Sequence, residues 1–179
     1  MSVICQRLES SMLKALLQSG SEELLTSNSF ALATDAIAVE IVNTRLHWDS
    51  AFGSFDLNFY TGLSQQEQVL PAVTIACTQA QADEAAPAVH SCEMQIALKF
   101  PADDSTANPD VPAALHGVGV WLENELAIPS RTRENLEKAE HSVVVTGVTT
   151  ASGSRGIDAD NRSRWLLFTF TVVASLNPP

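Results

Sequence analysis

The strongest pattern in the sequence is a regular alternation of apolar and polar side chains between residues 89 and 100. The apolar positions fall on every second residue and are Cys92, Met94, Ile96, Leu98 and Phe100. A period of two is the spacing at which side chains reach one face of a β-strand. Residues 89–100 are therefore predicted to form a strand with one face in the core, and the chain must contain a β-sheet.

Two segments before it carry strand patterns of the same kind. Phe55, Leu57 and Phe59 alternate with polar residues up to Gly62, and residues 70–77 alternate after Pro71. Proline has no amide proton to give to a ladder, so it places this segment at a strand start or a sheet edge.

The C-terminal segment, residues 142–175, is predicted to form a long hairpin. Its strands are expected at 143–148 and 165–174, joined by a loop at 152–163 that is rich in glycine, aspartate and arginine. The second strand is apolar on both faces, because Trp165 and Leu167 alternate with a full set of apolar residues. That strand is either central in the sheet or meets another chain with its second face.

Two helices are predicted from apolar residues spaced three and four apart. The first spans residues 3–17, with Gly20 as its C-terminal cap and charged residues such as Glu9 between the apolar ones. The second begins at Asp110 and ends before Pro129, and its glycines, among them Gly119, are expected to permit close packing against a neighbour. Residues 131–141 have room for one more helical turn, and residues 21–54 stay undecided between helix and strand.

These elements predict an α+β fold. It is a mostly antiparallel sheet with an N-terminal helix, a second helix packed on the sheet and the long C-terminal hairpin. At 179 residues and 19.2 kDa the chain suits a single domain, 1–179, that needs no disulfide or metal as a staple. The three cysteines, Cys5, Cys77 and Cys92, lie in apolar settings and are expected to be buried free thiols.

The charge of the chain excludes several classes of partner. Ten basic against 21 acidic side chains give a net charge of −11, which repels phosphate and disfavours both nucleic-acid binding and docking on anionic lipid. The N-terminal segment lacks the basic and apolar regions of a secretory signal, and no apolar run reaches the roughly 20 residues of a bilayer span. We therefore expect a protein made in the cytosol.

Short motifs of catalysis and cofactor binding are absent from the sequence. It contains no glycine-rich phosphate loop, no nucleophile elbow, no zinc-protease helix and no paired CxxC. The segment Asp158 to Asn161 begins like a calcium loop but lacks the later ligands. We accordingly expect no enzymatic activity, no cofactor and no metal.

Arginine gathers in the C-terminal hairpin of this acidic chain. The residues concerned, with the acidic and aromatic residues among them, are Arg155, Asp158, Asp160, Arg162, Arg164 and Trp165. One interpretation is a solvated turn. The other is a subunit interface, since alternating arginine and aspartate can pair head to tail with the next copy of the same protein.

The order of these elements resembles the tail-terminator and tail-completion (neck) proteins of tailed phages. The resemblance rests on the amphipathic N-terminal helix, the Leu-Pro strand segment at Leu70 to Ile75, the helix after the central strand, and the arginine-containing last strand from Arg164 to Ala174. It covers most of residues 1–176. Residues 21–54 are longer than such a subunit needs.

The resemblance implies a structural virion subunit. It would form a homohexameric ring at the head-proximal end of the phage tail, stop the tail tube, and join it to the neck. Its partners would be further copies of itself, the tail-tube protein and a neck or connector protein, with DNA only passing through the lumen and no membrane involved. The alternatives are another neck or tail-tube subunit, or a non-viral ligand-binding module with a pocket between helix and sheet.

Overall fold

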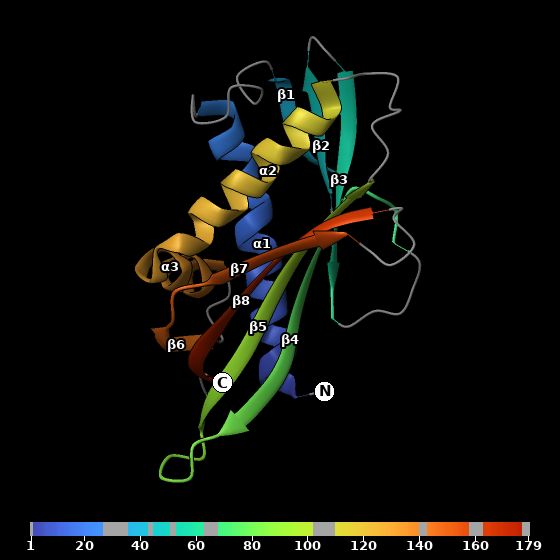
Figure 1. The fold of residues 1–179 in the computed structure, drawn as a ribbon. Helices are drawn as coiled ribbons and strands as arrows, with labels where there is room; N and C mark the ends of the chain where they lie inside the picture. The colour runs from blue at the N-terminus through green and yellow to red at the C-terminus, as the bar shows by residue number, and fades with distance from the viewer. Residues whose placement is uncertain are drawn as a thin grey trace.

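The computed structural model describes most of the chain. The described residues are 2–26, 36–42, 45–50, 53–62, 68–101, 110–139, 143–157 and 163–176. They form an α+β structure in which helices and a mostly antiparallel sheet pack together, as the sequence predicted (Figure 1).

Within the described residues, eight strands form one sheet. The strands are β1 (Ala36–Val42), β2 (Arg45–Ser50), β3 (Gly53–Thr61), β4 (Ala72–Ala82), β5 (Val89–Pro101), β6 (Val143–Val148), β7 (Ser152–Ile157) and β8 (Ser163–Leu176). Their order is β1-β2-β3-β4-β5-β8-β6, and β7 also pairs with β8. Neighbouring strands are antiparallel except β3 and β4, which are parallel.

The long strands β5 and β8 form the centre of the sheet. They pair without a register shift from Val89 opposite Ser175 to Pro101 opposite Ser163. This confirms the strand predicted for residues 89–100, whose alternating apolar positions are buried from Cys92 to Leu98. Residues that face each other across an antiparallel pair point to the same side, so Leu98 and Leu166 share one face while Lys99 and Trp165 share the other.

The C-terminal segment contains a strand that the sequence analysis missed. Residues 152–157 were predicted as loop, but they form β7 and pair with Thr169 to Arg164 of β8. β6 pairs with the other end of the same edge of β8, opposite residues 172–176. Between β6 and β7, Thr149 N donates a hydrogen bond to Thr171 O of β8, so the chain from β6 to β7 stays hydrogen-bonded along nearly the whole of this edge of β8. β8 is therefore a central strand, with β5 on one side and β6 and β7 on the other.

Three helices in the described chain all lie on one face of the sheet. They are α1 (Val3–Thr26), α2 (Asp110–Ala127) and α3 (Pro129–Ala139). Figure 1 shows α1 running behind the strands, with α2 and α3 beside it. We call this side the helix-covered face.

Helix α1 covers the sheet with the apolar stripe that the sequence predicted. Ile4, Leu8, Met12 and Leu16 follow one another at four-residue intervals and are all buried. The helix does not end at Gly20, as predicted, but continues to Thr26. The following segment, Glu22-Glu23-Leu24-Leu25, consists of good helix formers that outweigh one glycine, which costs about 1 kcal/mol.

Helices α2 and α3 are joined by polar contacts at their junction. The Glu125 carboxylate on α2 is only 2% exposed and accepts hydrogen bonds from Arg131 Nη2 at 2.6 Å and Asn135 Nδ2 at 3.3 Å. α3 spans three turns rather than the single turn predicted for this segment. The paired charges let a buried carboxylate anchor α3 against α2.

The region that the sequence left undecided contains strands. Residues 36–42 and 45–50 form β1 and β2, and β2 pairs in register with β3 from Arg45 opposite Asn58 to Ser50 opposite Gly53. β3 ends at Thr61 and is followed by Gly62, whose φ of 80° lies in the left-handed region that glycine adopts without strain. β1 is thus one edge of the described sheet, and β6 with β7 the other.

The hairpin of β4 and β5 reaches beyond the rest of the molecule, as Figure 1 shows. Its turn is ordered by Asp83, whose Oδ1 accepts from the amides of Ala85 at 2.8 Å and Ala86 at 3.3 Å. Residues 81–88 are exposed, and so is Ser91. We call residues 81–91 the arm.

Candidate interaction surfaces

The candidate interface residues separate into two groups in the structure. Arg155 lies on β7, and Arg164 and Trp165 lie on β8, close together in the pairing register. Asp158, Asp160 and Arg162 lie outside the described residues. The three that are described all border one groove, but Trp165 points to the opposite side of the strands from Arg155 and Arg164, because neighbouring residues of a strand point to opposite faces.

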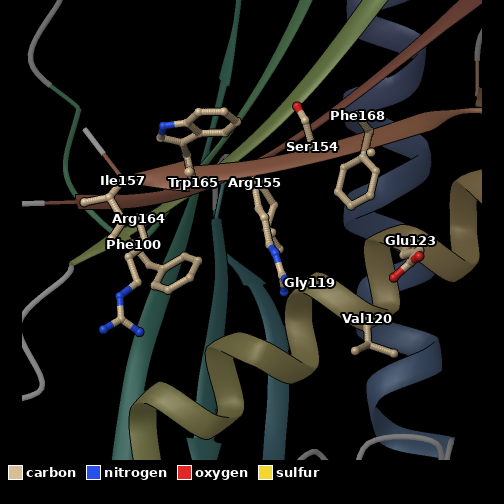
Figure 2. A pocket seen from close by; sticks show the side chains of 13 residues that line it. Phe100, Gly119, Val120, Glu123, Ser154, Arg155, Ile157, Arg164, Trp165 and Phe168 are labelled. Carbon is tan, nitrogen blue, oxygen red and sulfur yellow. The ribbon is translucent and has the colours of Figure 1, made fainter. Parts of the chain in front are cut away.

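A groove of about 690 Å³ lies between α2 and the paired strands β7 and β8. Its lining combines apolar side chains, glycines, charged groups and the serine and tryptophan of the strands: Phe100, Gly119, Val120, Glu123, Gly153, Ser154, Arg155, Gly156, Ile157, Arg164, Trp165, Leu166 and Phe168. Figure 2 shows Phe100, Arg155, Arg164 and Phe168 extending from the strands toward α2. The volume falls within the roughly 300–1,000 Å³ of ligand pockets in proteins.

Helix α2 and strand β8 approach each other closely where Gly119 lines the groove. A Cβ atom at Gly119 would lie 2.6 Å from Leu166 Cδ1. The absence of a side chain therefore lets α2 approach β8, as the sequence analysis expected of this glycine.

Charged side chains border the apolar part of the groove, which we call its floor and which consists of Phe100, Leu166 and Phe168. Arg155, Arg164 and Glu123 are all exposed. Among the lining residues that the structure describes, two arginines against one glutamate give a charge of 2 − 1 = +1, in a chain whose net charge is −11. The groove is thus a locally basic site with an apolar floor, which suits a partner that carries carboxylates next to apolar groups.

Trp165 belongs to the opposite side of the strands. It pairs with Gly156, and Figure 2 shows its indole pointing away from α2. A Cβ atom at Gly156 would lie 2.4 Å from Trp165 Cζ2, so the indole occupies the space that a side chain at residue 156 would need. The glycine of β7 therefore allows Trp165 to lie flat along the sheet.

The side of the sheet that carries Trp165 is open, since no helix among the described residues covers it. Alternate residues of β8 point to this open face: Trp165, Leu167, Thr169, Thr171 and Val173. All five are half-buried rather than buried. Apolar and threonine side chains thus form a stripe along the middle of the open face, and a surface of this kind suits contact with another protein.

A polar network occupies the part of the open face that lies on β2 and β3. Asp56 accepts a hydrogen bond from Arg45 Nη1 at 3.1 Å and lies 2.6 Å from His47 Nδ1. All three side chains are partly exposed, at 35–43%. One end of the open face is therefore charged and hydrogen-bonded, while the stripe on β8 is largely apolar.

The three thiols are buried and free, as predicted, between α1 and the sheet. Burial and a hydrogen bond with Cys77 raise the pKa of Cys5 to about 12. A hydrogen bond with Cys92, and then burial, raise the pKa of Cys77 as well. The hydrogen bond with Cys77 lowers the pKa of Cys92. All three thiols are buried in the core, where reagents in solvent do not reach them, so we interpret this cluster as a feature of the core.

Glu9 is buried beside these thiols, against the expectation that it lies on the polar side of its helix. Its Oε1 accepts a hydrogen bond from Cys77 N at 2.8 Å, at the register shift that separates Cys77 from Gln79 in β4. A bulge leaves a backbone amide without a ladder partner, and the carboxylate supplies one. Burial raises the pKa of Glu9.

The described part of the chain shows neither a metal-binding cluster nor a membrane-spanning helix. No group of three or more histidine, cysteine or acidic side chains is arranged to hold a metal ion there. None of the helices described is long and apolar enough to span a bilayer.

The sequence identified Arg155 and Arg164 but missed the groove that they line. Its lining joins Phe100 of β5, residues of α2, and residues of β7 and β8, so the site combines segments that lie up to 68 positions apart in the chain. Of the two glycines in which the sequence indicated close helix packing, Gly117 and Gly119, the structure shows the close approach at Gly119. No family model matches the chain. No curated protein matches it either.

Proposed function

We propose that the protein is a structural subunit of a tailed-phage virion that assembles into a ring at the head-proximal end of the tail. In this role it is a tail terminator, which caps the tail tube and offers its other side to a neck or connector protein. It acts in the virion after assembly in the host cytoplasm, with DNA passing through the lumen, and it has no catalytic task. The ring is a homohexamer.

The observation that carries this proposal is the placement of all described helices on one face of a sheet whose other face is open. A two-layer protein with a half-buried stripe of Trp165, Leu167 and Val173 on its open face has a surface suited to contact with a partner. Thr169 and Thr171, which lie between them, add hydroxyl groups to that stripe.

The two edges of the sheet also favour a ring. β1 is at one edge and β6 with β7 at the other, and their sequences differ. Contacts that join two unlike surfaces are heterologous, and they close into a ring when the rotation per subunit divides a full turn. Exposed edge strands are surfaces on which another chain can add a strand.

Electron microscopy of the purified protein tests this proposal. We expect ring-shaped particles with a central opening. The open-face variant Leu167→Glu should reduce the fraction of particles in rings, because it places a charge in the stripe. Lys138→Glu is the control on another surface, since Lys138 is exposed on α3 and its ion pair among the described residues is with Glu134 on the same helix, at 3.6 Å. Equal ring fractions in both variants would argue against the open face as an assembly surface.

The groove favours a second candidate function, a binding module for an amphipathic carboxylate such as a fatty acid. Its apolar floor and two arginines are the arrangement that such a ligand needs. In this case a fatty acid would raise the melting temperature of the wild-type protein and not of Arg155→Ala, and the protein would be a monomer. Absence of a shift with chain lengths that fit the groove would exclude it.

A further inference from the structure

We propose that the groove between α2 and β7–β8 receives the arm of a second copy of this chain. The arm is the β4–β5 hairpin tip, residues 81–91, and the contact is head to tail because one copy gives the arm and the next gives the groove. The inference rests on the proposed assembly function and adds to it a named contact between subunits.

The first support is the shape of the arm. The pairing of β4 with β5 continues to Ala82 opposite His90, which lie five residues beyond Cys77 and two residues beyond Cys92 toward the turn; these two cysteines are the core-buried residues nearest the turn. Residues beyond that point are held away from the helices, as Figure 1 shows. A paired and turn-ordered hairpin presents its tip in one conformation, so little conformational entropy is lost when it binds.

The second support is the chemistry of the arm tip. Asp83 and Glu84 carry two negative charges, and the next four residues are Ala85, Ala86, Pro87 and Ala88. These six residues are all exposed. It therefore places two carboxylates beside a short run of small apolar side chains.

The third support is that the groove has the complementary composition. Arg155 and Arg164 stand on its strand side, and Phe100, Leu166 and Phe168 contribute apolar lining. Small side chains such as alanine and proline fit a groove of about 690 Å³ without needing a deep pocket. The carboxylates of the arm would meet the arginines while the alanines contact the apolar floor.

Within one chain the arm and the groove belong to different regions. The arm extends β4 and β5 at one end, whereas the groove lies at the opposite end of β5, beside Phe100. Residues 90 and 100 of one strand are separated by about 33 Å, at roughly 3.3 Å per residue. An arm that enters the groove must then come from another copy, and each copy still has an arm and a groove to offer to the next.

The test reverses the charges of Glu84 on the arm and Arg155 in the groove, which the proposal brings together. Both are exposed, and neither is part of the core. Asp83 is unsuitable because its carboxylate holds the turn of the arm. The variants are Glu84→Arg, Arg155→Glu and the double variant, with Glu134→Arg as a control that makes the same change in charge on α3, where Glu134 is 66% exposed.

Sedimentation velocity of the wild type and these variants is the test. The wild-type mass reports on the proposed assembly, and the variants report on the arm. We expect each single variant to associate at least about tenfold more weakly, the double variant to regain the wild-type mass, and Glu134→Arg to keep it. A 1:1 mixture of the two single variants should also reassemble.

Three results would overturn the inference. If the wild type assembles and both single variants keep its mass, the ring uses another contact and only the arm proposal fails. If the single variants dissociate but the double variant does not recover, the two residues do not meet. A wild type that stays monomeric at every soluble concentration refutes the assembly function and the arm contact together.

Discussion

Glycine at residue 156 allows the indole of Trp165 to lie along the open face, and its replacement by alanine should therefore displace that indole. The new Cβ would lie 2.4 Å from Cζ2 and 2.7 Å from Cε2 of Trp165. Ordinary carbon contacts are about 3.5–4.0 Å, so the ring must move by roughly 1 Å or more. Overpacking of this kind costs about 1–3 kcal/mol.

Gly153, in the same strand, is the matched control. A Cβ there would meet Phe168 at 3.5 and 3.6 Å, which is ordinary contact. Replacing a strand glycine removes an entropy cost of about 0.5–1 kcal/mol, so Gly153→Ala should stabilise by that amount. The same gain applies to Gly156→Ala but is outweighed by the clash, and we expect a net loss of about 0.5–2 kcal/mol.

Urea unfolding of both variants measures this difference. In the background Trp165→Leu the clash is removed, and Gly156→Ala should then stabilise as Gly153→Ala does, which makes a double-mutant cycle. Equal free energies of unfolding for the two alanine variants in the wild-type background would refute the reasoning.

Two further predictions concern the core. The pKa of Glu9 is raised above its ordinary value of 4.5 in the folded state, so the folded protein favours the protonated form and loses stability as pH rises through the raised pKa. Glu9→Gln keeps an acceptor for Cys77 N. The free energy of unfolding of this variant, minus that of the wild type, should increase from about pH 4.5 upward and then become constant. A difference that does not change with pH would contradict this. The thiols of Cys5, Cys77 and Cys92 are buried, so a thiol reagent at pH 8 should label none of them in the native protein and all 3 after unfolding; rapid native labelling would show that the cluster is accessible.

Local sequence patterns predicted those elements whose side chains repeat at a regular interval. The alternation from Cys92 to Phe100 identified β5, and the spacing from Ile4 to Leu16 identified the buried stripe of α1. In both cases one face is buried, and burial imposes a period on the sequence that can be read without a structure.

The parts that were missed depend on contacts between distant residues. β7 consists of Ser-Gly-Ser-Arg-Gly-Ile, which has almost no strand propensity, and it is a strand because β8 offers a paired edge. Glu9 looked like a surface residue because the amide that it binds belongs to Cys77, 68 positions later. The groove could not be predicted for the same reason, since α2, β5, β7 and β8 meet only in the folded chain.

The mass of the wild-type protein in solution, measured by light scattering over a range of concentrations, tests the central claim most directly. A ring of six subunits predicts a particle near six times 19.2 kDa that persists on dilution. A mass of 19.2 kDa at every concentration would contradict the claim that this chain is a self-assembling ring subunit.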